Sequence, residues 1–380
     1  MTTQNLDDTD NIELENRIYT ISHLTPVQIK AGMMHKEESI RLQLAEYMGF
    51  TATFELAEIG LTDKSSEVRK VWAERMDYTP TPEQIERGLT DQSDMVRWAW
   101  TQRTDILFTP MQIERGLTDI DVDIRWAWTV REDFTPTPEQ VERGLADNDV
   151  QVRTAWARRT DFTPTAQQIE NGLTDEKLSV RAAWGKRLDF TPTPKQVERG
   201  LTDASESVRV AWAKRMDWTP TPEQVERALT DPLWSVRLEW AQRTDFTPTP
   251  EQVERGLSDG AVSVRAAWAR RMDWTPTSEQ VKRGITDCDE TVRAAWAERM
   301  DWTPTSEQVE IGLQDASVIV KKAWVVRSDY TPTQEQIKRG LLDDDEDIRE
   351  AWVQKAADIL ERQSDSECTM SDITLLSATL

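Results

Sequence analysis

Histidine and cysteine, the side chains that most often carry catalysis or bind metals near neutral pH, are scarce in this chain. It has two histidines, His23 and His35, and two cysteines, Cys288 and Cys368, which form no Cys-x-x-Cys spacing. No Ser-His-Asp set, glycine-rich phosphate loop or zinc-type spacing is present, and no pair of carboxylates stands out as acid and base. We therefore expect a protein that is not an enzyme and has no catalytic residue, cofactor or metal site.

Two acidic triplets, 119–123 and 343–347, space their aspartates as the start of an EF-hand calcium loop does. In the first triplet, Ile124 and Val130 stand where the calcium loop needs glycine and glutamate, and the second triplet departs in the same way. Acid at the start of a helix interacts favourably with the helix dipole. We therefore interpret both triplets as helix starts.

Charged and aromatic residues recur along the chain with a constant period of 28 residues, the spacing from Trp72 to Trp100. Eleven tryptophans follow this period without a slip, from Trp72 to Trp352. A basic residue lies three positions before each tryptophan, and an aspartate lies six positions before that basic residue, as in Asp147, Arg153 and Trp156. Repeated aspartates would neutralise a phosphate-binding track, so we interpret the charged pairs as ion-pair ladders. The tryptophans are interpreted as core, in preference to a stacking track for bases or sugars.

Each unit has the signals of two short helices. In one unit, Thr137 is a favourable N-cap, Pro138 suits the first helical position, and Gln140 completes a capping box. Residues 152–159 place their apolar side chains on one face of a second helix. Gly144, near the end of the first helix, is expected to permit close approach of the neighbouring helix. Since a helix pair this short cannot bury a core alone, the units must stack.

The period predicts an all-α protein, an α-solenoid of about twelve two-helix repeats of 28 residues. The aspartate-x5-arginine pattern of each unit begins at the turn between the two helices. We expect these parts: an acidic, partly disordered N-terminal segment over 1–24, the solenoid over 25–362, and a polar C-terminal tail over 363–380. Within the solenoid we expect a degenerate first repeat over 25–52, clear repeats from residue 53, and a C-terminal capping helix over about 347–362.

The aspartate-x5-arginine pattern, with valine before the arginine, resembles the HEAT-like repeat families, and most of all the short repeats of phycobilin-lyase-type proteins. The preceding Thr-Pro-x-Gln-Val-x-x-Gly-Leu helix is also similar to the leucine-rich repeat variant, another helical solenoid. The resemblance covers about residues 25–360. It implies that Asp147, Arg153 and their equivalents form a ladder between adjacent units. The short period and the tryptophan depart from the HEAT pattern, and folds of this kind mostly bind proteins.

Residues that interrupt the period are better candidates for binding than residues that keep it. Trp98 and Trp126 occupy equivalent positions that hold threonine or alanine in many other units, and Val130 is less polar than most of its counterparts. Trp234 lies in a turn position beside Pro232. Second helices tend to line the concave face of such solenoids, where an exposed tryptophan is typical of an interaction site. The predicted partner-binding residues are therefore Trp98, Trp126, Val130 and Trp234, with a local packing variant as the alternative.

The formal charge of −23 disfavours a nucleic-acid backbone or an anionic membrane as the partner. We predict a non-enzymatic scaffold that binds a protein partner, which the charge allows to be basic. The cysteine usage predicts a cytoplasmic location, and no apolar run is long enough to span a membrane. An alternative is an acidic inhibitor that mimics nucleic acid, which exposed carboxylates spaced like phosphates would favour. A second alternative, an enzyme that excises alkylated DNA bases, is disfavoured by the charge. The oligomeric state stays open.

Overall fold

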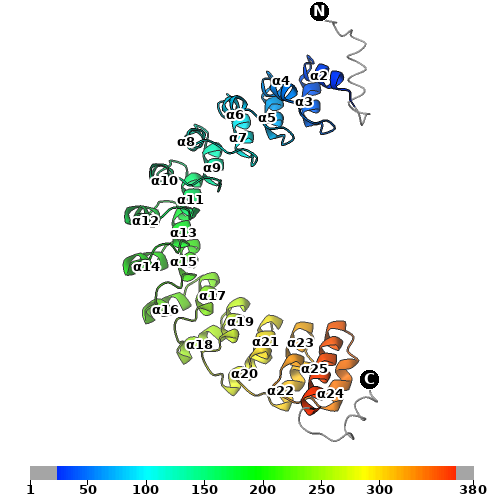
Figure 1. Cartoon of the computed structure of the whole chain (residues 1–380). Helices are drawn as coiled ribbons and strands as arrows, with labels where there is room; N and C mark the ends of the chain where they lie inside the picture. Colours follow the sequence, from blue (N-terminus) through cyan, green and yellow to red (C-terminus); the bar gives the residue numbers. More distant parts are fainter. Residues whose placement is uncertain (1–23, 365–380) are drawn as a thin grey trace, which may run out of the picture. The chain divides into compact units, whose positions relative to one another are not determined.

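The computed structural model of the chain describes residues 24–364, and these residues form helices joined by short turns (Figure 1). Twenty-four helices, α2 to α25, lie within the described residues, two to each repeat. They divide into two compact units, one up to Asp189 and one from Phe190. The predicted all-α solenoid of two-helix repeats is confirmed. The predicted segments 1–24 and 363–380 lie, apart from three residues, outside the described part of the chain.

In the first unit, each repeat contributes one helix to each of two layers (Figure 1). The first helices are α2 (Pro26–Met33), α4 (Phe54–Leu61), α6 (Pro82–Leu89), α8 (Pro110–Leu117), α10 (Pro138–Leu145) and α12 (Ala166–Leu173). The second helices are α3 (Glu38–Glu46), α5 (Ser66–Glu74), α7 (Asp94–Thr101), α9 (Val122–Thr129), α11 (Val150–Arg158) and α13 (Leu178–Gly185). Neighbouring second helices pack more closely than neighbouring first helices, as expected for the inner side of a curved stack.

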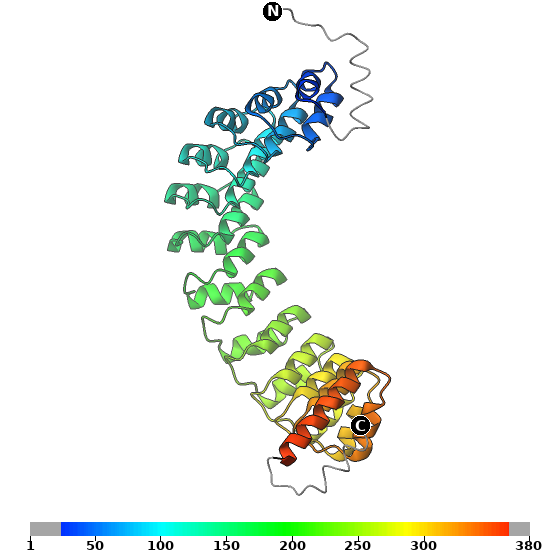
Figure 2. The ribbon, with the colours of Figure 1, turned by 45° about the vertical axis from the view of Figure 1, so that its right-hand side comes forward.

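The second unit repeats this arrangement. Its first helices are α14 (Pro194–Leu201), α16 (Pro222–Leu229), α18 (Pro250–Leu257), α20 (Ser278–Ile285), α22 (Ser306–Leu313) and α24 (Gln334–Leu341). Its second helices are α15 (Glu206–Ala213), α17 (Trp234–Gln242), α19 (Val262–Arg270), α21 (Glu290–Glu298), α23 (Val318–Val326) and α25 (Glu346–Ser364). Helix α25 has 19 residues and extends beyond the length of the other second helices (Figure 2).

The predicted helix signals act as expected in α10. The Thr137 hydroxyl accepts a hydrogen bond from the Gln140 amide at 3.3 Å, and the Gln140 side chain accepts one from the Thr137 amide at 2.9 Å. This reciprocal box satisfies two of the amides that a helix start leaves unpaired. The helix ends after Leu145, where the Asp147 amide donates to the Gly144 carbonyl at 3.3 Å. The turn that follows places Asp147 between the two helices of its repeat.

The repeated tryptophans form the centre of each repeat, and all eleven are buried, as predicted. Trp156 is 1% exposed and packs directly over Gly144 of the preceding helix. A Cβ atom placed on Gly144 would lie only 2.0 Å from the Trp156 Nε1 atom. The close approach that the sequence predicts at this glycine is therefore made by the indole ring of the same repeat. Glycine is favoured there because a side chain would displace the ring from the space that it fills.

We expect Gly144→Ala to lower the free energy of unfolding by about 1 kcal/mol. Overpacking costs about 1–3 kcal/mol, and the better helix propensity of alanine offsets part of it. The repeat that carries Ala228 still buries Trp240 completely, so the ring can move to admit a methyl group. The measurement is urea unfolding, with Gly260→Ala as control because a Cβ atom at Gly260 meets nothing within 4 Å. Equal stability of the Gly144 variant and the control would contradict the expected clash.

The connection after α7 departs from the repeat. Ile106 occupies the position where most repeats have an aromatic residue, and Leu107 is exposed. Phe108, two positions later, supplies the aromatic ring instead. Its centroid lies 4.8 Å from the Trp128 centroid, and the Arg131 guanidinium lies 4.8 Å from the Phe108 ring. The aromatic layer therefore continues through this irregular connection.

Candidate interaction surface

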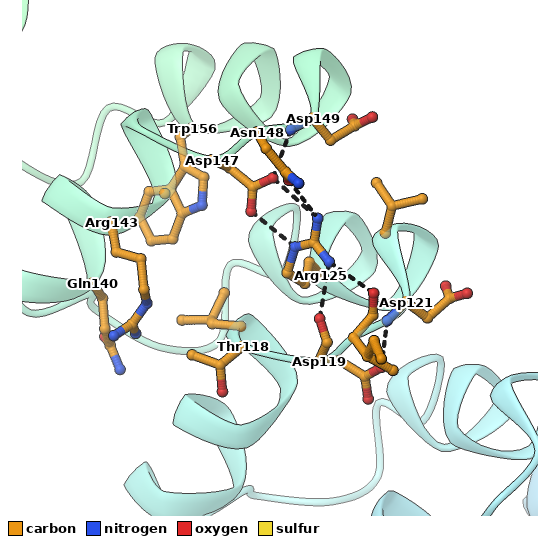
Figure 3. A pocket seen from close by; sticks show the side chains of 14 residues that line it. Thr118, Asp119, Asp121, Arg125, Gln140, Arg143, Asp147, Asn148, Asp149 and Trp156 are labelled. Atoms are coloured by element: carbon orange, nitrogen blue, oxygen red, sulfur yellow. Dashed lines mark hydrogen bonds and ion pairs between the residues drawn. The ribbon is translucent and has the colours of Figure 1, made fainter.

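The repeated aspartates and arginines form a ladder between adjacent repeats, which we call the Asp–Arg ladder. The Arg125 Nε atom lies 2.8 Å from Asp147 Oδ2, and Arg125 Nη2 lies 3.0 Å from Asp147 Oδ1. Figure 3 shows these two side chains facing each other. The same guanidinium donates to the Asp119 carbonyl at 2.9 Å. The predicted ladder is thus confirmed, and Arg125 bridges the aspartate of its own repeat and that of the next. The hydrogen bond that Arg125 donates to Asp147 raises the pKa of Arg125, with burial opposing it.

In this ladder, the carboxylate of Asp91 is held ionised by its partners. Burial by itself would raise the pKa of Asp91, but hydrogen bonds from the Arg69 guanidinium and the Ser93 amide outweigh burial. The pKa of Asp91 therefore lies below its ordinary value. A carboxylate stabilised in this way is a poor general base, because its proton affinity is reduced. The ladder is accordingly structural.

A cavity of about 650 Å³ lies beside Arg125 (Figure 3). Its carboxylates have local partners: Asp121 caps α9 by accepting hydrogen bonds from the amides of Asp123 at 2.9 Å and Ile124 at 3.3 Å. Asp119 belongs to the Asp–Arg ladder through Arg97, at 2.8 Å. The predicted helix start at the first acidic triplet is therefore confirmed. Because these carboxylates already serve a cap and a ladder, the cavity offers no free acid–base pair.

A second set of arginines, three positions after each repeated tryptophan from Trp72 to Trp324, lies between aromatic rings, and we call them the stacked arginines. Arg103 is 0% exposed, and its guanidinium lies 4.9 Å from the Tyr78 ring and 5.4 Å from the Trp100 ring. It also donates to the carbonyls of Ala73, Arg75 and Tyr78, at 3.2, 2.7 and 3.2 Å. Each stacked arginine thus ties one repeat to the repeat before it.

The two arginines that flank one repeated tryptophan make different contacts. Arg159, which follows Trp156, lies 5.5 Å from its ring and 4.7 Å from the Phe134 ring. Arg153, which precedes the same tryptophan, instead forms an ion pair with Asp175 at 2.8 Å. The two arginines of a repeat therefore have different roles. Arg159 stacks on aromatic rings, and Arg153 belongs to the Asp–Arg ladder.

Glutamates and arginines of adjacent first helices form a third ladder, the Glu–Arg ladder, at the surface. Glu310 accepts hydrogen bonds from Arg339 at 2.6 Å and from Gln336 at 3.0 Å. These bonds, the one from Arg339 first, lower the pKa of Glu310 from 4.5 to about 2, although burial opposes them. Because the folded state has the lower pKa, this stabilisation is complete above pH 4.5 and is lost as the pH falls toward 2.

We expect Glu310→Gln to weaken the dependence of stability on pH between about 4.5 and 2. Above this window the variant should be slightly less stable than the wild type, because an exposed ion pair contributes little. Within it, the difference should shrink as Glu310 of the wild type becomes protonated. Urea unfolding at a series of pH values measures this directly. A stability difference that stays constant from neutral pH down to pH 2 would contradict the assignment.

Two of the predicted partner-binding residues line one cavity in the structure. Trp126 is 40% exposed and Val130 is 47% exposed, on the surface of α9 and at its C-cap. They form one wall of a cavity of about 490 Å³, and Arg158 at the end of α11 lies on the other wall. We call this space the Trp126 cavity. An exposed tryptophan is a residue type that is enriched in protein-interaction sites.

The other two predicted residues lie elsewhere. Trp98, one repeat earlier on α7, is half-buried and packs against the core, and it does not line the Trp126 cavity. Trp234 is exposed beside Leu233 at the start of α17, in the second unit. Sequence reasoning therefore identified two residues of the cavity and missed Arg158. Arg158 occupies the same repeat position as Val130, and comparing that position along the chain would have found it.

The comparisons with known proteins agree with the repeat geometry. Residues 166–183 match the family described as the HEAT repeat associated with sister chromatid cohesion, and these residues span α12 and most of α13. The match therefore covers most of one two-helix repeat of this chain. Among solved structures, the chain is similar to "a leucine-rich repeat variant with a novel repetitive protein structural motif". The identity is 21%, the TM-score is 0.41, and the match covers 66% of this chain and 87% of that chain.

No curated protein matches the chain. The predicted resemblance to HEAT-like repeats and to the leucine-rich repeat variant is confirmed, while the resemblance to phycobilin-lyase-type repeats stays a prediction. Across residues 24–364, every helix is too short or too polar to cross a membrane.

Proposed function

We propose that this HEAT-type solenoid is a non-enzymatic scaffold that binds a protein partner on the second-helix layer of its first unit. The observation that carries the proposal is the Trp126 cavity, where Trp126 and Val130 are exposed together between α9 and α11. The repeated charged residues support the proposal indirectly. Their side chains are engaged in the Asp–Arg ladder, the Glu–Arg ladder and the stacked arginines, so the irregular residues are left to provide specificity.

The net charge of −23 favours, over long distances, a partner whose own charge is positive. Mimicry of nucleic acid is less well supported, because carboxylates of both ladders are paired with arginines inside the protein and do not form a free phosphate-like array. Excision of DNA bases has no supporting observation. We place the protein in the cytoplasm, on the basis of its cysteine usage.

We expect the double variant Trp126→Ala, Val130→Asp to lose at least tenfold in affinity for the partner, because truncation of a central aromatic residue commonly removes about 2 kcal/mol or more. The measurement is capture from an extract of the native cell, with and without nuclease, followed by binding of the purified partner. The matched control is Met111→Ala, on the first helix of the same repeat, where Met111 is 73% exposed.

Unchanged partner binding by the double variant would contradict the proposed surface. Capture that disappears after nuclease treatment would show that the partner is a nucleic acid, against the charge argument. Loss of binding in the Met111 control would place the site on the first-helix layer instead.

A further inference from the structure

The position two residues after each repeated tryptophan forms a continuous column on the second-helix layer of the first unit. In the degenerate first repeat, Leu44 takes the place of the tryptophan. We call this set the second-helix column. Its members, one on each successive second helix or directly after it, are Glu46, Glu74, Gln102, Val130, Arg158 and Lys186. All six are exposed, and successive second helices pack against one another, so the column is a continuous strip of surface.

The chemistry of the column changes in one direction. It begins with two carboxylates, passes through an amide and an aliphatic side chain, and ends with two cations. Glu46, Arg158 and Lys186 form no ion pair with any other residue in the described part of the chain, and Glu74 has only a loose contact with Lys70 at 3.9 Å. These charges are therefore available to a ligand, unlike the charges of the ladders.

The same position in the second unit shows no such order. There Lys214 is paired with Glu239 at 3.2 Å, and Arg270 is paired with Glu298 at 3.5 Å. The ordered, unpaired column is thus a property of the first unit, which also holds the Trp126 cavity. The cavity lies between Val130 and Arg158, at the point where the column changes from apolar to basic.

We propose that the second-helix column binds an extended protein segment of mixed charge, with an apolar side chain in the Trp126 cavity and acidic residues on Arg158 and Lys186. Basic residues of the segment, on the other side of its apolar anchor, contact Glu74 and Glu46. This inference rests on the proposed function and specifies the chemistry of the partner. Packed helices lie about 8–10 Å apart, so the six positions span about 40–50 Å. An extended segment of about 12–15 residues covers that length.

Two other occupants fit the column less well. A nucleic acid would meet only two unpaired cations, and Glu46 and Glu74 would repel its backbone. The column of a second copy, lying in the reverse direction, has complementary charges. However, the second-helix layer is the inner side of the stack, so two copies cannot bring their columns together over the whole length.

The test is selection of a displayed library of random 16-residue peptides on the immobilised full-length chain, followed by affinity measurements with the enriched peptides. We expect enriched peptides to carry an apolar residue flanked by Asp or Glu on one side and by Lys or Arg on the other. The double variant Arg158→Glu, Lys186→Glu should bind them at least tenfold more weakly. Its matched control is Lys195→Glu, Lys282→Glu, which changes the net charge equally at exposed positions on first helices of the second unit.

Enrichment of peptides without this charge order, equal weakening by the control, or no enrichment at all would overturn the inference. The inference would also be wrong if the wild-type chain self-associates and the Arg158 and Lys186 reversals abolish this self-association. The occupant of the column would then be a second copy. If peptide binding requires Trp126 but is unchanged by the Arg158 and Lys186 reversals, the inference is wrong and the proposed function stands. If peptide binding is also unchanged by substitution of Trp126, both the inference and the proposed function are wrong.

Discussion

Arg103→Ala is expected to lower the free energy of unfolding of the first unit by about 3–5 kcal/mol, because buried main-chain carbonyls lose their donor, at about 1–3 kcal/mol each, and a gap opens between two rings. The guanidinium of Arg103 is fully buried, and its Nε and Nη2 atoms lie 3.0 and 2.6 Å from the two Asp105 carboxylate oxygens. Truncation would leave this carboxylate without its cation and would leave three main-chain carbonyls of the preceding repeat without their donor. It would also open a gap between two aromatic rings.

The last repeat shows what a conservative substitution at the stacked-arginine position can retain. Lys355 stands at the stacked-arginine position there, donates to the Arg327 carbonyl and lies 4.8 Å from the Tyr330 ring. Arg103→Lys should therefore cost less than Arg103→Ala, because the charge and one carbonyl contact can remain. Hydrogen exchange along the chain is the suitable measurement, since repeats can unfold separately. The surface arginine Arg115, changed to Ala, is the control, with an expected loss below about 1 kcal/mol. Similar losses for Arg103→Ala and Arg115→Ala would contradict the structural role of the stack.

Trp156→Ala is expected to lower the free energy of unfolding by about 3–5 kcal/mol, because a fully buried aromatic side chain is removed from the centre of its repeat. The cavity left behind would be bordered by Gly144, which has no side chain to fill it. The change should also remove the ring on one side of Arg159, so the repeats on both sides should lose protection in hydrogen exchange.

The control for this change is Trp126→Ala, in the same layer but 40% exposed. It should cost less than Trp156→Ala, because part of the Trp126 ring is already in water and little cavity forms. Urea unfolding followed by far-ultraviolet circular dichroism compares the two without depending on tryptophan fluorescence. A loss at Trp126 as large as that at Trp156 would mean that Trp126 is core, and the packing-variant interpretation of this residue would then be correct.

The sequence by itself determined the repeat and its local structure. Capping boxes, the glycine near the end of most first helices and the spacing of apolar residues are signals within a few residues of one another, and the constant period presents them many times. Thr137 and Gln140 therefore act as their types and spacing predict. The Asp–Arg ladder could also be predicted from the sequence, because charged residues repeated in register must meet when identical units stack.

Only the tertiary structure decided the other contacts across the repeats. Arg153 and Arg159 look alike in the sequence, yet one pairs with the aspartate of the next repeat and the other stacks between rings, since the offset between helices sets what each can reach. The same offset buries part of Trp98, leaves Trp126 beside a cavity, and places Val130 next to Arg158. Such neighbours lie one full repeat apart in the chain, and only the packing of α9 against α11 brings them together.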